Sequence, residues 1–226
     1  EQGTALLFAH LMRLDDNRVG QPTALPGWTR GHLLTHLARQ AEGFGRLLAW
    51  ARTGVRTPMY ESWERRNADI AAGAGRPLSE LLADVRATTE ALEAAITTLP
   101  EAAWSATVMT GQGEEIAARV VPWLRAREVS LHTLDLDLAA TWQELVPSFV
   151  DAVLDEATRD FANRSGLPAL SLRPADRDRS WAWGDGPPIT LEGPASALLA
   201  WLIGRPGGAV VHRVGGGELP QLPAWL

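Results

Sequence analysis

Residues 121–139 read VPWLRAREVSLHTLDLDLA, and this stretch decides how the first part of the chain should fold. At 3.6 residues per turn, its pattern predicts a helix with one mainly apolar side. That side carries Leu124, Glu128, Leu131, His132, Asp135 and Leu138. It should face the core, yet the carboxylate of Glu128 and the imidazole of His132 lie in its middle. Burying a charged group without a partner costs several kcal/mol, so this pair needs an explanation.

The Glu128/His132 pair has a metal-binding interpretation and two structural ones. Side chains at positions i and i+4 of a helix can present two ligands to one metal ion. Alternatively, the pair forms a hydrogen-bonded polar contact within the core, or the helix is rolled so that both side chains meet solvent. A pattern this short does not decide between these interpretations.

The composition excludes several kinds of chemistry. The chain has no Cys, which excludes disulfides, thiolate metal sites and a thiol nucleophile of the protein's own. All of the 21 basic residues are Arg, so a catalytic Lys is excluded as well. A net charge of −6 without a basic block argues against a nucleic-acid partner. No apolar run approaches the ~20 residues of a membrane span and no signal peptide is visible, so we expect no membrane partner and a cytoplasmic location.

The length of 226 residues suits two modest domains, and 46% hydrophobic residues are enough for a real core. Apolar periodicity predicts helices over 4–16, 28–52 and 77–99, besides the one over 121–139. Thr29 is the expected N-cap of the second helix and Gly54 its stop. Four helices within the first 146 residues predict an all-α four-helix bundle, and bundle cores are places where facing helices assemble metal sites.

Residues 147–226 follow a different pattern. We expect a helix over 148–163, strands over 167–172, 181–183 and 189–192, a short helix over 194–202 and a further strand over 210–214. This mixture predicts a small α+β domain. The chain is therefore expected to have two domains, 1–146 and 147–226. A hairpin is expected within 107–119, just before the opening helix.

A third candidate ligand lies on the second helix. His36 falls at the edge of the inward face of that helix, which makes it a second inward-facing imidazole. The set His36, Glu128 and His132 suits Zn²⁺ or a similar divalent ion, and three protein ligands leave open positions as in catalytic sites. Asp135, one turn after His132, is expected either to orient a ligand or to be an exposed carboxylate at the helix end.

Several segments also carry a family resemblance. They are LPGWTRGHLLTHLARQA (25–41), ARTGVRTPMYESWERRNADI (51–70), LRAREVSLHTLDLDL (124–138), WLIGRPGG (201–208) and LPAWL (222–226). Together they resemble the mycothiol-dependent maleylpyruvate isomerases. The patterns GWTxxHLxxH and REVxxH are shared with a wider set of DinB-like proteins, whereas TPMYxSxExRN and the terminal segment narrow the resemblance to the isomerase.

The resemblance implies a DinB-like four-helix bundle plus a small C-terminal α+β domain, with the active site between them. It places the metal ligands at His36, Glu128 and His132 and functional arginines at Arg66 and Arg205. The chain departs from the family pattern in its first helix and in the strands before residue 194, which leaves the choice of substrate open.

The activity that this resemblance implies is cis–trans isomerisation of maleylpyruvate to fumarylpyruvate, a step of gentisate breakdown. The thiol of mycothiol would be activated by the metal, add to the double bond and leave after rotation. Arg66 and Arg205 would bind the carboxylates of this small dicarboxylate substrate, and Arg205 would also stabilise the developing enolate as a catalytic residue. The alternatives are a mycothiol S-transferase and a non-catalytic metal- or ligand-binding module. The sequence sets no oligomeric state.

Overall fold

The structure is a computed structural model that describes residues 1–225; Leu226, the last residue of the closing LPAWL segment, lies outside the described residues. The chain forms two compact units, Glu1–Ala139 and Ala140–Leu226. The first is helical and the second combines helices with a sheet, which confirms the predicted fold class. Within residues 1–225, no helix is both long enough and apolar enough to cross a bilayer.

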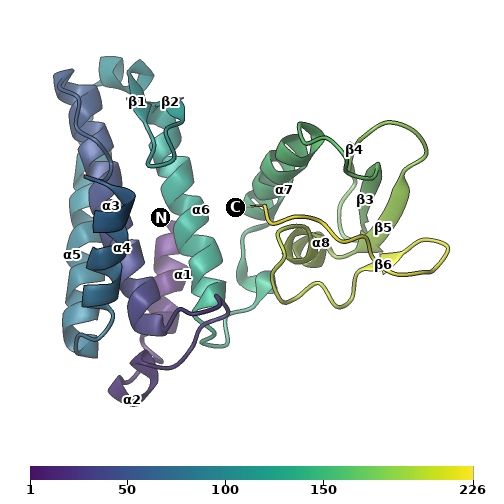
Figure 1. Cartoon of the computed structure of the whole chain (residues 1–226), viewed down its shortest axis with the longest axis horizontal. Coiled ribbons are helices and arrows are strands. Elements are labelled where there is room, and N and C mark those ends of the chain that lie inside the picture. Colours follow the sequence, from purple (N-terminus) through teal and green to yellow (C-terminus); the bar gives the residue numbers. More distant parts are fainter. Residues whose placement is uncertain (226) are drawn as a thin grey trace. The chain divides into compact units, whose positions relative to one another are not determined.

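Four helices form the bundle of the first unit (Figure 1): α1 (Gln2–Leu11), α3 (Arg30–Thr53), α5 (Leu78–Thr97) and α6 (Val121–Asp135). Helix α3 packs against both α5 and α6, and α1 packs against α6. Two apolar clusters fill the space between them, one around Leu34 and Leu81 and one around Phe44 and Leu92. The predicted bundle therefore forms, with α3 at the centre of the helix contacts.

Local signals place the ends of α3 as expected. The Thr29 side chain accepts a hydrogen bond from the backbone N–H of His32, and Gly54 ends the helix with a φ of 72°. That left-handed conformation favours glycine because it has no Cβ to clash with the backbone. The predicted start and stop of this helix are confirmed to within a residue or two.

Short elements depart from the sequence-based expectations. The first helix ends at Leu11 and not at residue 16, and α2 (Asp16–Val19) follows as a separate helix that was not expected. Helix α4 (Trp63–Gly73) also lies outside the helices that the apolar periodicity predicts. Both helices begin at a side-chain cap, Asp15 for α2 and Ser62 for α4. Helix α2 is a single turn, and α4 buries only Ile70, so neither shows a clear apolar period.

The expected hairpin forms from β1 (Thr107–Met109) and β2 (Glu115–Ala117), which pair antiparallel with Val108 opposite Ile116. The short 3-10 helices η1 (Glu101–Ser105) and η2 (Ala118–Val120) flank it. Because η2 runs directly into α6, the hairpin positions the start of the helix that carries Glu128 and His132.

The second unit packs two helices against one mixed sheet. Its elements are η3 (Trp142–Glu144), α7 (Pro147–Ala162), β3 (Leu170–Pro174), β4 (Trp181–Trp183), β5 (Ile189–Gly193), α8 (Ala195–Leu202) and β6 (His212–Arg213). The strand order is β4-β3-β5-β6, and β3 and β5 are the parallel pair. Helix α7 packs on β4 and on α8, while α8 packs on β3 and β5.

Candidate metal centre

Helices α3 and α6 bring three candidate ligands to one point. His36 lies on the second turn of α3, and Glu128 and His132 lie one turn apart on α6. The Oε2 atom of Glu128 is 3.1 Å from Nε2 of His36 and 3.2 Å from Nε2 of His132. The two imidazole rings meet edge to face, with their centroids 5.0 Å apart. His36 is buried and the other two side chains are half-buried.

The spacing of these atoms suits a bound metal ion. One ligand atom from each residue lies within 4.8 Å of the other two. Ligand atoms that share a tetrahedral Zn²⁺ at bond lengths of about 2.1 Å lie roughly 3.4 Å apart. Two imidazole nitrogens and one carboxylate oxygen are a donor set that Zn²⁺ and similar ions accept. The cluster could therefore bind a divalent metal ion and leave coordination positions open.

Asp135 supports His132 from the second ring nitrogen. Its Oδ2 lies 2.9 Å from Nδ1 of His132, and the residue is only 1% exposed. The expected alternative of an exposed carboxylate at the helix end is therefore wrong, and the contact fits the orienting role. A carboxylate that accepts the Nδ1–H of a metal-binding histidine fixes the ring and leaves Nε2 facing the ion.

His36 has a different neighbour at its second nitrogen. The Nη2 atom of Arg66, on α4, lies 3.0 Å from Nδ1 of His36. The guanidinium of Arg66 also packs on two aromatic rings, 5.6 Å from the centroid of Tyr60 and 5.0 Å from that of Trp63. Its Nη1 donates to the side chain of Asn67, and its buried Nε has no hydrogen-bond partner among residues 1–225. Arg66 thus lies beside the cluster, and within residues 1–225 it forms no ion pair with a carboxylate.

The pKa values of the three clustered groups are shifted in different directions. Burial lowers the pKa of His36 to about 4, against the opposing effect of its hydrogen bond to Glu128. Burial would also lower the pKa of His132, but hydrogen bonds to Asp135 and Glu128 and their negative charges raise it to about 9. Burial alone would raise the pKa of Glu128, yet the two histidines hold it well below its usual value. At neutral pH the metal-free cluster therefore holds a carboxylate, an imidazolium at His132 and a neutral His36.

Two buried arginines tie α3 to α6 on either side of the ligands. Arg30, at the start of α3, donates to the carbonyl oxygens of Leu136 and Asp137 just after α6, at 2.8 and 3.0 Å. Arg125, on α6, donates to the carbonyl oxygen of Leu37 at 2.9 Å and to the side chain of Gln40 at 3.0 Å. Leu37 directly follows His36, so this contact fixes the part of α3 that carries a ligand.

The buried contacts of Arg30 and Arg125 were not predicted, because arginine in a helix usually reaches solvent. One signal was available for Arg125. It precedes Glu128 by three residues, which places it one turn earlier on nearly the same side of the helix. An arginine so close to a predicted inward face suggests a buried contact.

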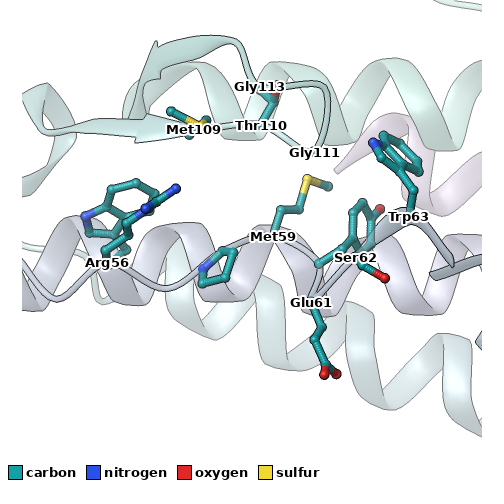
Figure 2. A pocket seen from close by; sticks show the side chains of 12 residues that line it. Arg56, Met59, Glu61, Ser62, Trp63, Met109, Thr110, Gly111 and Gly113 are labelled. Atoms are coloured by element: carbon teal, nitrogen blue, oxygen red, sulfur yellow. The ribbon is translucent and has the colours of Figure 1, made fainter. Parts of the chain in front are cut away.

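A pocket of about 240 Å³ borders the aromatic rings that hold Arg66. Figure 2 shows it between the segment that leads into α4, with Met59, Ser62 and Trp63, and the β1–β2 turn, with Thr110 and Gly111. The turn approaches this segment closely, because a Cβ on Gly111 would come within 2.9 Å of the Tyr60 ring. Aromatic, hydroxyl and cationic side chains thus line one wall of the region next to Arg66.

Arg205 lies in the second unit, in the turn after α8, where Gly204 has a φ of 70°. Its backbone N–H donates to the carbonyl oxygen of Ala200. The arginine lines a hollow of about 860 Å³ together with Trp201, Gly207 and residues 219–224 of the closing segment. The structure thus brings together the three predicted metal ligands and Arg66 within the first unit, and the predicted role of Arg205 stays a prediction.

Comparisons with known proteins agree with this arrangement. Residues 1–137 match the mycothiol maleylpyruvate isomerase N-terminal domain, and residues 144–224 match the corresponding C-terminal domain. The crystal structure of the mycothiol-dependent maleylpyruvate isomerase is similar, with 30% identity and a TM-score of 0.92 over 99% of this chain and 92% of that one. A structure of a histidine-to-alanine mutant of that enzyme matches at 29% identity over the same shares, with a TM-score of 0.91. No match was found among the curated proteins. The chain belongs to the mycothiol maleylpyruvate isomerase family.

Proposed function

We propose that this protein is a cis–trans isomerase that converts maleylpyruvate to fumarylpyruvate, with a divalent metal ion and mycothiol as cofactors. The observation that carries the proposal is the convergence of His36, Glu128 and His132 in a chain of this family. The solved relative that spans nearly the whole chain is the mycothiol-dependent maleylpyruvate isomerase. Family membership supports the proposed reaction, and the cluster supports the metal-dependent chemistry that this reaction needs.

The protein's own residues would hold the metal and not the nucleophile. His36, Glu128 and His132 would coordinate the ion, with Zn²⁺ as the first choice for this donor set. When bound, the ion would deprotonate the cofactor's thiol, which gives a Cys-free chain the nucleophile that it lacks. Asp135 would keep Nε2 of His132 facing the ion through its hydrogen bond at Nδ1.

Arg66 would bind a carboxylate of the substrate. Its guanidinium makes no ion pair with any carboxylate of residues 1–225, and its Nε is buried without a partner. Leaving such a group without an anion is costly, whereas a substrate carboxylate could accept two of its N–H bonds. The neighbouring pocket offers space for a small ligand at the Tyr60 and Trp63 rings.

Arg205 is proposed as the second carboxylate-binding residue and as the donor that stabilises the developing enolate oxygen. The basis is its place in the WLIGRPGG segment, which resembles the family pattern. A fixed cation at a point where negative charge develops lowers a barrier more than it strengthens ground-state binding.

The proposal is tested by following maleylpyruvate with and without mycothiol, using metal-loaded and metal-stripped protein. We expect fumarylpyruvate to form only when both metal and thiol are present. A stable thioether product would instead identify an S-transferase. Absence of any thiol-dependent turnover would indicate a binding module.

The cluster itself is tested by His36→Ala, with His212→Ala as the matched control. His212 is an exposed histidine on β6 of the second unit and takes no part in the cluster. We expect His36→Ala to lose both bound metal and turnover, and His212→Ala to keep both. A fully active, metal-free His36→Ala protein would contradict the metal-dependent proposal.

A further inference from the structure

The two imidazoles of the metal centre face opposite kinds of partner at their second nitrogen. Nδ1 of His132 lies against a carboxylate oxygen of Asp135, which can only accept a hydrogen bond. Nδ1 of His36 lies against Nη2 of Arg66, and a guanidinium nitrogen can only donate. The Nδ1 of His36 must therefore offer a lone pair, so the proton of this neutral ring is on Nε2. That Nε2–H points to Oε2 of Glu128.

Metal binding by His36 requires the other tautomer. A neutral imidazole carries one N–H, so a ring that binds a metal ion through Nε2 carries its proton on Nδ1. Metal-binding histidines donate this proton to a carboxylate, a carbonyl group or a water. At His36 the Nδ1–H would meet the N–H of Arg66, and two donors cannot share a hydrogen bond. The observed contact of Arg66 and coordination by His36 exclude each other.

The guanidinium of Arg66 can occupy a position away from Nδ1 of His36. This group packs on the Tyr60 and Trp63 rings, which lie at the border of the 240 Å³ pocket. Its other hydrogen bonds run to the adjacent Asn67 and to Tyr60, one of the two residues whose rings it already packs on. A small rotation about the side-chain bonds can leave the arginine on the aromatic rings while it clears Nδ1.

We propose that Arg66 is a metal-dependent switch: it hydrogen-bonds to His36 in the metal-free protein, and metal binding at His36 displaces it from Nδ1 while its guanidinium stays on the Tyr60 and Trp63 rings. This inference rests on the proposed metal site and adds an order of events. Before the metal arrives, the arginine is engaged with a ligand of the ion. After metal binding, the N–H donors of Arg66 are free to bind an anionic substrate. The binding site for that anion is therefore complete only when the metal is present.

The first test measures the affinity for Zn²⁺ by competition with a chromophoric chelator. Arg66→Met removes the competing donor, and Arg66→Gln replaces it with an amide oxygen that can accept the Nδ1–H. Both variants should bind Zn²⁺ at least about tenfold more tightly than the natural protein, because a hydrogen bond from a charged donor no longer has to be broken.

Arg65→Met is the matched control. It removes the same charge from the adjacent position, where the exposed Arg65 pairs with Asp69 and does not contact His36. We expect less than a twofold change in its Zn²⁺ affinity. If Arg66→Met and Arg66→Gln bind Zn²⁺ no more tightly than Arg65→Met, the switch is wrong while the metal site stands. If even the natural protein binds no Zn²⁺, both the proposed metal site and the proposed switch are wrong.

The second test observes the tautomer directly by ¹⁵N NMR of the histidine side chains. The metal-free protein should show His36 with its proton on Nε2, and the Zn²⁺-loaded protein should show the proton on Nδ1. His132 should keep its Nδ1–H in both states. A metal-free His36 that already carries its proton on Nδ1 would overturn the inference, whatever the affinities of the variants.

Discussion

Within residues 1–225, the interior of Glu1–Ala139 holds buried titratable and cationic side chains, among them His36, Arg125 and Asp135. The buried polar side chains of Ala140–Leu226 are the hydroxyls of Thr158, Ser171 and Ser196, set among apolar residues. Burying charge is costly, whereas burying apolar surface stabilises a fold. The interior of the second unit is thus an ordinary apolar core, whereas the interior of the first unit holds charged side chains where α3 meets α6. This difference locates the candidate metal site in the first unit.

The largest expected effect comes from damaging the apolar interior. Phe161 is fully buried on α7, and its ring stacks on Trp183 at 5.6 Å. Phe161→Ala should lower the free energy of unfolding of the second unit by about 3–5 kcal/mol, because it removes apolar contacts and leaves a cavity. Chemical denaturation measures the change.

Val210→Ala, at a position that is 62% exposed in the same unit, is the control and should change stability by less than about 0.5 kcal/mol. Zn²⁺ affinity should stay the same in both variants, since neither residue belongs to the first unit. A loss of Zn²⁺ affinity in Phe161→Ala would contradict the prediction that metal binding depends on the interior of the first unit and not on that of the second.

Arg205 is the second unit's proposed contribution to the reaction. Arg205→Ala should raise the activation barrier by about 2.7–4 kcal/mol, the usual cost of losing a donor that stabilises developing negative charge. Steady-state kinetics with maleylpyruvate, at fixed mycothiol and metal, gives the ratio of kcat/KM. Near-native turnover by Arg205→Ala would show that Arg205 does not have the proposed role in the reaction. The proposed metal ligands would be unaffected by this result.

A smaller effect is expected from the buried carboxylate of the first unit. Asp135→Asn should weaken metal binding by about 10–100-fold, because the negative charge that orients His132 and strengthens it as a ligand is lost. Chelator competition measures the affinity. An unchanged affinity would show that Asp135 is a structural buried group like the hydroxyls of the second unit.

The smallest expected effect, counted per pH unit, is the dependence of metal binding on pH. In the metal-free protein the pKa of His132 is raised to about 9, so at pH 7 this ring is protonated and must lose a proton before it can bind an ion. Metal binding should therefore release about one proton at pH 7, and affinity should increase about tenfold per pH unit up to roughly pH 9.

Calorimetry in two buffers of different ionisation enthalpy measures this proton release. Asp135→Asn should reduce it, because the Asp135 charge is one cause of the raised pKa. Binding without any proton release at pH 7 would show that His132 is already neutral and would contradict the charge distribution assigned to the cluster.

Much of the first unit follows from local sequence. Thr29 and Gly54 predict the ends of α3, because a cap side chain and a left-handed glycine act within one turn. The helices α2 and α4 were not predicted, since α2 is a single turn and α4 buries only Ile70, so neither shows an apolar period. In the second unit, the strand over Trp181–Trp183 was expected at those residues, whereas the parallel pairing of β3 with β5 depends on contacts between segments distant in sequence.

The sequence by itself determined that Glu128 and His132 share one side of a helix and that His36 faces inward on another, because helical period is a local property. Only the tertiary structure decided that Nε2 of His36 comes within 3.1 Å of Glu128, across 92 positions of the chain. The approach and rotation of α3 and α6 depend on contacts such as those of Arg30 and Arg125, which no local pattern specifies. For the same reason the opposite partners of the two imidazoles, Asp135 for His132 and Arg66 for His36, became visible only in three dimensions.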